Sequence, residues 1–377
     1  MPLRRPRPAY VPPFYSSTNA VHRPFCCSTS SAPSSNGVPR PPQTVKVSKI
    51  STNRSHDVST DDGRKGFGHV VTVDEMTQSL HSEDDPLWQL MKREASNAAS
   101  EEPQLASALY ATILVHETLE ETLGTTLGNA LDTPTFQATQ WVELFREAMA
   151  DDPEYGKAVR ADIAAVMQRD PASSHAARVM LYSKGFQALE SWRCAHWLWN
   201  KGRTSLALYM QSMISNRFAV DIHPAAKIGH GVLIDHGTGI VIGETATLGN
   251  NVSLLHNVTL GGTGKETGDR HPKVGDGVMI GAGAAILGNI KVGMGAHIAA
   301  CSVVLKPVEP FAIISGVPGK MVGKVSYKAG VMPSFVMDQR LSIDVLGTKN
   351  PYHSAVTGSV KGVHTHEDDE LFEGSSI

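Results

Sequence analysis

The stretch KVGDGVMIGAGAAILGNIKVGMGAHIAACSVV, residues 273–304, carries an aliphatic side chain at every sixth position. Residues 222–258 show the same spacing, and the thirteen positions that share it are Ile222, Ile228, Ile234, Ile240, Ala246, Val252, Val258, Val274, Ile280, Ile286, Val292, Ile298 and Val304. Six is a multiple of the two-residue strand period, so these side chains face one side of an extended chain. Twelve of the thirteen are β-branched, as strands favour. The period predicts a parallel β-helix in which three hexads complete one triangular coil.

The spacing predicts a single break in this repeat. Val258 and Val274 lie sixteen residues apart, which is not a multiple of six. We therefore expect residues 261–272, GGTGKETGDRHP, to leave the coil as a loop, and its four glycines agree with that expectation. Loops on rigid scaffolds are common places for catalytic or binding residues.

The preceding region, residues 84–218, has the apolar spacing of amphipathic helices. Four dipeptides join an acceptor side chain to proline, a combination typical of helix starts. They are Asp85-Pro86, Thr133-Pro134, Asp152-Pro153 and Asp170-Pro171. His196 lies among tryptophans in this region, which favours a packing role over metal binding or catalysis. The predicted fold class is α+β, with a helical domain at 84–218 and a β-helix at 219–325.

The two ends differ in composition from the rest. Residues 1–56 contain arginine, serine, threonine and proline but no Asp or Glu, which is typical of an organelle transit segment and predicts a chloroplast or mitochondrial protein. The alternative is a disordered tail on a cytoplasmic protein. Residues 1–83 are therefore assigned to a disordered or transit segment. Residues 326–377 form a C-terminal tail that becomes acidic from residue 364.

Composition excludes several classes of partner. A formal net charge of −3 is too small to attract nucleic acid or anionic lipid, and no apolar run is long enough to span a bilayer. The four cysteines match neither a disulfide framework nor a paired-cysteine zinc site. We therefore expect no nucleic-acid partner, no membrane span and no metal.

Several longer motifs follow one another in order. They are RDPA (169–172), KGFQAL (184–189), DIHPAAKIG (221–229), IDHGTGIVIGETA (234–246), VTLGGTGK (258–265) and GDRHPK (268–273). Together they resemble the plant-type serine acetyltransferase family of hexapeptide-repeat acyltransferases, and the resemblance covers residues 84–325. It implies a left-handed coil. It also implies acetyl transfer from acetyl-CoA to L-serine in cysteine biosynthesis, with acetyl-CoA as co-substrate and no tightly bound cofactor.

Acetyl transfer to a hydroxyl group needs a base, and a neutral imidazole can accept the proton as the thioester is attacked. His236 in the Asp-His-Gly-Thr-Gly motif matches the family's catalytic histidine, and Asp221 matches its carboxylate partner. Fifteen residues separate them, close to one coil of eighteen, so we expect adjacent turns to bring them together. Asp221 would then fix the tautomer of His236 and stabilise its imidazolium form.

The resemblance also assigns the substrate contacts. It places Asp170 and Asp235 at the ammonium group of serine, and Arg270 and His271 at its carboxylate, which suits the planar guanidinium.

For acetyl-CoA, the resemblance places four small residues, Gly262, Thr263, Ala282 and Ala300, along a groove between neighbouring β-helices. Backbone N–H groups of the run 261–264 could stabilise the oxyanion of the tetrahedral intermediate. For Ala282 and Ala300 a purely structural role at coil corners is the alternative.

The resemblance extends to assembly and regulation. It implies a homotrimer or homohexamer with active sites at subunit junctions, inhibition by L-cysteine, and binding of O-acetylserine (thiol) lyase through the C-terminal Ile377. The tail beyond residue 332 is longer and more acidic than the family pattern, so we expect this binding to be weak.

Three other functions fit parts of the sequence. A hexapeptide acyltransferase acting on a sugar would not need the two acids, Arg270 and His271 together. A zinc-dependent hydratase of the carbonic anhydrase type is suggested by His223, His230, His236, His256 and His271. Zinc ligands must converge on one metal, but His230 and His236 are one hexad apart and point from different sides of a coil. A scaffold without activity would not need both Asp221 and His236.

Overall fold

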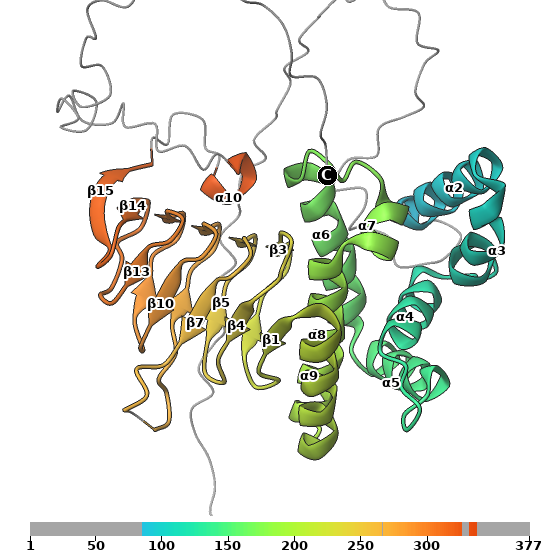
Figure 1. Ribbon diagram of the computed structural model, residues 1–377, viewed down its shortest axis with the longest axis horizontal. Coiled ribbons are helices and arrows are strands. Elements are labelled where there is room, and N and C mark those ends of the chain that lie inside the picture. Colours follow the sequence, from blue (N-terminus) through green and yellow to red (C-terminus); the bar gives the residue numbers. More distant parts are fainter. Residues whose placement is uncertain (1–84, 266, 326–331, 338–377) are drawn as a thin grey trace, which may run out of the picture. The chain divides into compact units, whose positions relative to one another are not determined.

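The computed structural model describes residues 85–265, 267–325 and 332–337 (Figure 1). The expectations for the transit segment and for Ile377 lie outside these residues. No helix in the described part is long and apolar enough to cross a membrane.

Residues before 219 form the expected helices. Their bounds are α2 Pro86–Glu101, η1 Pro103–Leu105, α3 Ala106–Leu109, η2 Tyr110–Leu114, α4 Leu119–Ala130, α5 Ala138–Asp151, α6 Pro153–Arg169, α7 Ala176–Tyr182, α8 Lys184–Asn200 and α9 Thr204–Phe218. A buried ion pair between Arg160 Nη2 and Asp85 Oδ2, 2.6 Å long, ties α6 to the start of α2. Arg160 Nη1 also pairs with Glu120 of α4 at 2.6 Å.

Two of the four predicted helix starts are confirmed and two are wrong. Asp85 and Asp152 cap α2 and α6, accepting from backbone N–H groups two or three residues on. Thr133 instead closes a turn, in which its Oγ1 accepts from Phe136 N at 3.0 Å. Asp170 ends α6, and its Oδ1 accepts from Ala172 N at 2.9 Å. In both cases the side chain that could cap a helix bonds within its own turn.

Residues from 220 onward form the predicted β-helix. The strands are β1 Val220–Ile222, β2 Lys227–Ile228, β3 Leu233–Ile234, β4 Ile240–Ile242, β5 Thr247–Leu248, β6 Ser253–Leu254, β7 Thr259–Gly261, β8 Lys273–Val274, β9 Met279–Ile280, β10 Ala285–Leu287, β11 Lys291–Val292, β12 His297–Ile298, β13 Val303–Val304, β14 Ala312–Ser315 and β15 Lys320–Lys324. They form three sheets, ordered β1-β4-β7-β10-β13, β11-β8-β5-β2 and β15-β14-β12-β9-β6-β3. All pairs are parallel except β14–β15, and α10 (Pro333–Val336) follows them. Every third strand therefore shares a side.

The prediction of one break in the repeat is wrong, because the register breaks twice. Val220 pairs with Ile240, twenty positions on, whereas Val241 pairs with Thr259, eighteen positions on. The first coil therefore holds two extra residues, at the corner between Ile234 and Ile240. The six-residue spacing in the sequence does not reveal this insertion, because each side of the coil has two columns of buried aliphatic residues. Ile240 belongs to one column and Ile242 to the other, so the spacing continues from one column into the next.

The second break is the predicted loop. Thr259 pairs with Ala285, twenty-six positions on, so this coil is eight residues longer than an eighteen-residue coil. The extra residues lie between β7 and β8.

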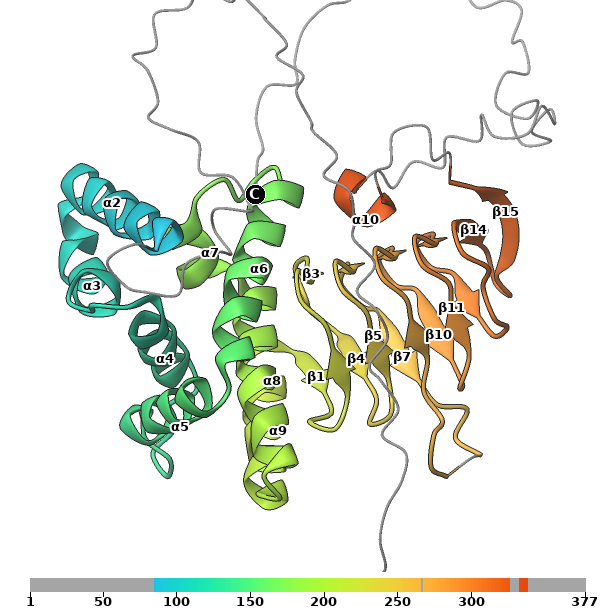
Figure 2. The same ribbon diagram turned by 180° about the vertical axis from the view of Figure 1, so that it is seen from behind.

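The helices and the first coil contact each other through α8 and α9, which lie beside β1 in both views (Figures 1 and 2). Trp192 Nε1 donates to His223 O at 3.0 Å, and Asp162 Oδ1 accepts from Val232 N at 2.7 Å. Gly185 makes the approach possible, because a Cβ there would lie 2.0 Å from Ile234 O. This contact fixes the strand that leads into the first inserted corner.

Candidate active site

The inserted corner carries His236. The backbone of His236 has φ 58°, and Gly237 and Gly239 follow with φ 70° and 76°. This left-handed backbone turns the chain sharply, and 72% of the His236 side chain is exposed. Its Nε2 lies 3.7 Å from Asp235 Oδ1. The corner with two extra residues therefore exposes the imidazole of His236 to solvent, beside the carboxylate of Asp235.

His256 occupies the same corner one coil further along. β3 pairs with β6 in a twenty-residue register, which places residue 256 next to residue 236. The two rings meet edge to face with centroids 5.8 Å apart. From the sequence, His256 was a candidate only for a zinc ligand. The predicted coil of eighteen residues would place Leu254 beside His236, so it did not reveal this pair of histidines.

Asp170 and Asp235 form an acidic group at this corner. Burial raises the pKa of Asp235 above its usual value, and the negative charge of Asp170 raises it further, while His236 and His256 oppose the shift. Asp170 Oδ2 accepts from Ser173 Oγ at 2.6 Å, which holds its carboxylate within the turn after α6. Two neighbouring carboxylates, one of which raises the pKa of the other, are well placed to bind a cation.

A second group surrounds Arg270 and His271, at the end of the loop. Arg270 Nη2 pairs with Glu244 Oε2 at 2.8 Å. The backbone N–H groups of Arg270 and His271 both donate to Thr245 Oγ1, at 3.0 and 3.1 Å. Glu244 was not singled out from the sequence, although it lies in a quoted motif. These bonds fix the loop end on the coil that precedes it.

The tautomer of His271 follows from its hydrogen bonds. Thr245 N donates to His271 Nδ1 at 3.2 Å, so the hydrogen of the neutral ring is on Nε2. Burial, and then the charge of Arg270, lowers the pKa of His271. Nε2 lies over Gly243, where a Cβ would be 2.0 Å away. A neutral donor beside a guanidinium suits carboxylate binding.

Asp221 lies on β1, opposite Val241 of β4. Its Oδ1 accepts from Gln211 Nε2 at 2.7 Å, and its charge opposes the lowering of the His223 pKa. In the described part of this chain no hydrogen bond or ion pair joins Asp221 to His236. The twenty-residue coil is the reason, because it places Asp221 within a flat side and His236 at a corner.

The candidate site residues thus fall into two groups within one chain. Asp170, Asp235 and His236 lie together at the corner. Arg270 and His271 lie together with Glu244, and both Asp221 and Glu244 act on the nearby His223. Among residues 85–265 and 267–325, no hydrogen bond or ion pair joins the two groups. One group is acidic, and the other contains a guanidinium.

The positions expected to contact CoA extend the histidine corner. Gly283 N donates to His256 O at 3.0 Å, and Cys301 N donates to Ala282 O at 2.8 Å. Residues 236, 256, 282 and 300 therefore follow one another along a single edge of the prism. Gly262 and Thr263 begin the loop after β7, and Gly262 lies against Arg270. A row of small side chains thus leads up to the two histidines.

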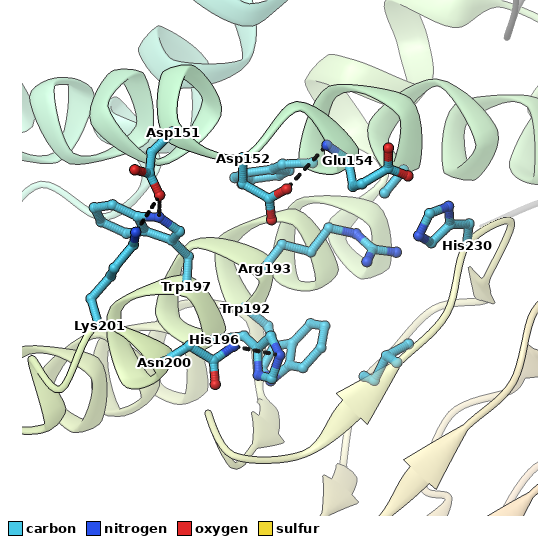
Figure 3. A pocket seen from close by; sticks show the side chains of 13 residues that line it. Asp151, Asp152, Glu154, Trp192, Arg193, His196, Trp197, Asn200, Lys201 and His230 are labelled. Carbon is cyan, nitrogen blue, oxygen red and sulfur yellow. Dashed lines mark hydrogen bonds and ion pairs between the residues drawn. The ribbon is translucent and has the colours of Figure 1, made fainter. Parts of the chain in front are cut away.

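A pocket of about 350 Å³ lies elsewhere, between α6, α8 and β2 (Figure 3). Asp151 in this pocket already has partners within the helical region. It accepts a hydrogen bond from Trp197 Nε1 at 2.8 Å and pairs with Lys201 Nζ at 2.7 Å. His196 bonds Pro224 O through Nδ1 at 2.6 Å and stacks on Trp192. These contacts agree with the packing role expected for His196. The pocket contains none of the predicted site residues.

No group of three His, Cys, Asp or Glu side chains that could hold a metal ion is found among the residues described. The zinc-hydratase alternative therefore has no ligand set in this part of the chain.

Comparison with known families gives two matches. Residues 87–191 match the family described as "Serine acetyltransferase, N-terminal", and residues 271–306 match "Bacterial transferase hexapeptide (six repeats)". Serine acetyltransferase of Salmonella typhimurium is 52% identical over 256 residues, which is 68% of this chain and 93% of the relative. Serine acetyltransferase 2 of Arabidopsis thaliana is 51% identical over 64% of this chain and 75% of the relative.

Solved structures give the same result. The soybean serine acetyltransferase complexed with serine is 52% identical with a TM-score of 0.63, covering 65% of this chain and 100% of that one. The serine acetyltransferase of Brucella abortus in complex with coenzyme A is 47% identical with a TM-score of 0.63, covering 64% and 97%. A serine acetyltransferase complex with cysteine is 50% identical with a TM-score of 0.66, covering 69% and 99%.

Proposed function

This chain belongs to the serine acetyltransferase family, and from that premise we propose which of its residues transfer the acetyl group of acetyl-CoA to the hydroxyl of L-serine. The chain is an acyltransferase that uses acetyl-CoA. The serine oxygen loses its proton and forms a bond to the thioester carbon, the carbon–sulfur bond breaks, and the proton ends on the sulfur of CoA. The products are O-acetyl-L-serine and CoA.

His236 is the general base. Its exposed ring at the inserted corner can approach the serine hydroxyl, accept the proton and return it to the departing thiolate. Asp221 is its proposed partner, contributed by a neighbouring subunit, because one chain places the two on different parts of the coil. A carboxylate there would orient the ring and stabilise the imidazolium.

Serine is held at both charged ends. Asp170 and Asp235 bind the ammonium group, whose positive charge offsets the burial and the repulsion by Asp170 that raise the Asp235 pKa. Arg270 and His271 of the neighbouring subunit bind the carboxylate. The observation that carries this proposal is that each chain holds two charge-complementary half-sites that do not touch. A homotrimer, alone or paired into a hexamer, brings opposite halves together at each junction.

Acetyl-CoA lies along the corner edge, against Ala282 and Ala300, with Gly262 and Thr263 beside its thioester end. His256 sits between His236 and Ala282 on this edge. Because its ring lies beside that of the proposed base, we assign it to the stabilisation of the oxyanion. Acetyl-CoA and serine supply all reacting atoms, so we propose that no tightly bound cofactor takes part.

Regulation and partners follow from the same site. L-cysteine has the same ammonium and carboxylate as L-serine, which supports feedback inhibition by competition for the two half-sites. Binding of O-acetylserine (thiol) lyase through Ile377 is proposed on family membership. Deleting Ile377 should abolish co-purification of the lyase while leaving acetyl transfer intact.

We propose a chloroplast or mitochondrial location on the composition of residues 1–56, with the cytoplasm as the alternative. Residues 1–83 fused to a fluorescent protein should direct it to the organelle. Uniform cytoplasmic fluorescence would favour the alternative.

The acceptor is tested by measuring the release of CoA thiol from acetyl-CoA with a panel of amino acids, sugars and simple alcohols. L-serine should be the preferred acceptor, and N-acetylated serine, which lacks the ammonium charge, should be poor. Preference for a sugar would contradict the proposal. His236→Ala should lower turnover by at least about a hundredfold, the usual scale of general-base catalysis.

A further inference from the structure

Arg169 is a buried cation at the end of α6. It is 4% exposed, and within the part of the chain that the structure describes no ion pair joins it to a carboxylate. Its Nη1 donates to Ser253 Oγ and its Nη2 to Asn251 Oδ1, both at 3.2 Å, and its Nε is buried without a hydrogen-bond partner. Burial lowers the pKa of Arg169 to about 10. Burying a cation without a paired anion costs free energy, so the position of Arg169 calls for an explanation.

The guanidinium of Arg169 is covered by α10, which follows the last coil in the sequence. The ring of Phe335, on α10, lies over the guanidinium with its centroid 4.3 Å from Cζ. Ser253 Oγ, which accepts from Arg169, donates to Ser334 O at 2.9 Å. The guanidinium is thus enclosed between β6 and α10, and α10 lies beside α6.

Met332 fixes α10 to the β-helix. Gly277 has φ +66° and leaves room for the Met332 side chain, because a Cβ at Gly277 would lie 2.3 Å from the Met332 sulfur. Ser334 is fully buried. Residues 332–335 are therefore seated by contacts on both sides, to the coils and to Arg169.

Asp170 follows Arg169 directly and needs to be held. Its carboxylate acts on Asp235 with a like charge, so electrostatic repulsion pushes the two apart when no cation is bound. Ala172 N and Ser173 Oγ hold the carboxylate within its turn, and the turn itself starts at Arg169. Arg169 is the side chain that fixes it, through bonds to β6, the strand whose coil also carries His256.

We propose that Arg169, which is packed against Phe335 and Ser334 of α10, is a positioning residue that holds Asp170 at the ammonium end of the amino-acid site. The inference rests on the proposed function, since it assigns Asp170 to that end. It connects the segment after the last coil with the affinity for the amino-acid substrate.

The test compares Phe335→Leu, which removes the π face and keeps an apolar side chain, with Val336→Ala on the same short helix. Val336 is 57% exposed, and the cation–π contact to Arg169 comes from Phe335. In the full-length enzyme, Phe335→Leu should raise the KM for L-serine about five- to tenfold, a change on the scale of a partly buried cation–π contact. kcat and the KM for acetyl-CoA should stay within about twofold. Phe335→Tyr, which keeps the ring, should restore the wild-type KM, and Val336→Ala should match wild type.

If the contact between Phe335 and Arg169 only stabilised the fold, the variants would behave differently. Phe335→Leu would then lower Tm and leave the KM for L-serine unchanged, or raise both KM values equally, and either result overturns the proposal. Arg169→Lys leaves α10 intact and serves as a second variant, with the same expected rise confined to L-serine. Asp170→Asn separates the two hypotheses. If it does not change the KM for L-serine, the proposed function is wrong at Asp170, whatever Phe335→Leu shows.

Discussion

The rings of His236 and His256 meet edge to face, 5.8 Å apart, on successive coils of one corner. The lengthened first coil brings them together, since residue 256 follows residue 236 by the twenty positions of that coil. One ring is exposed and lies beside Asp235, and the other stands between it and the row of small residues. This arrangement separates the base from the group assigned to the oxyanion.

Replacing His256 should affect chemistry more than binding. His256→Ala should lower kcat about ten- to a hundredfold with a small change in either KM, because the loss of an oxyanion donor is felt only in the transition state. His230→Ala is the control, since His230 lies at a different corner of the coil. Steady-state kinetics with both substrates varied measure the effect. An unchanged kcat would remove His256 from the mechanism.

Glu244 should act through Arg270. Glu244→Gln removes the charge that pairs with Arg270 Nη2 at 2.8 Å, so the guanidinium loses its fixed orientation. The KM for L-serine should rise about threefold to tenfold while the KM for acetyl-CoA stays constant, as expected for a weakened charge-assisted bond. Glu309→Gln, which alters an exposed pair with Lys324 at 3.3 Å, should change neither. A rise in both KM values would mean that Glu244 supports the fold and not the serine site.

The acidic pair predicts a pH effect of known sign. Asp170 raises the pKa of Asp235, so Asp170→Asn should move the titration midpoint of the Asp235 carboxyl to lower pH. Ammonium binding needs the ionised form of Asp235, and it is lost as the pH falls through this pKa. Carbon-13 NMR of the aspartate carboxyl groups measures both midpoints. A midpoint that stays in place would show that the two carboxylates do not interact.

Gly185 should be intolerant of a side chain. In Gly185→Ala the new Cβ would lie 2.0 Å from Ile234 O, so α8 must move away from the strand before His236. We expect a loss of about 1–3 kcal/mol in the free energy of unfolding, as in other overpacked cores, together with reduced turnover. Gly124→Ala in α4 is the matched control, since its Cβ would lie 3.5 Å from Phe145 Cβ, an ordinary contact. Denaturant unfolding followed by circular dichroism compares the two. Equal stability of both variants would contradict the close approach.

Much of the fold could be predicted because a β-branched residue at every sixth position is typical of a parallel β-helix. The inserted corner could not be predicted, because Ile240 and Ile242 are both aliphatic and both buried. The six-residue spacing therefore continues across the two extra residues. Asp170 accepts from the backbone N–H two residues on, as Asp152 does at the start of α6, but no helix follows it until Ala176. The capping residue alone does not decide whether a helix continues after it.

The site could be predicted only in part. The residue types follow from the chemistry and from the resemblance, and the acidic group of Asp170 and Asp235 lies together as that chemistry requires. The pairing of Asp221 with His236 was inferred from an eighteen-residue coil, and the actual coil of twenty places Asp221 opposite Val241. A partner carboxylate from a neighbouring subunit, as we propose for Asp221, would leave no trace in the spacing of one chain.

The central claim is that each active site is completed by a neighbouring subunit, and mixed assemblies test it most directly. His236→Ala and Asp221→Ala chains, each inactive alone, are dissociated, mixed and reassembled, and CoA release is then measured. The mixture should regain activity, because some junctions combine an intact His236 with an intact Asp221 from the next chain. A mixture of His236→Ala with Asp235→Ala, which damage the same half-site, should stay inactive. Equal inactivity of both mixtures, with mixed assembly verified by mass spectrometry, would contradict the account.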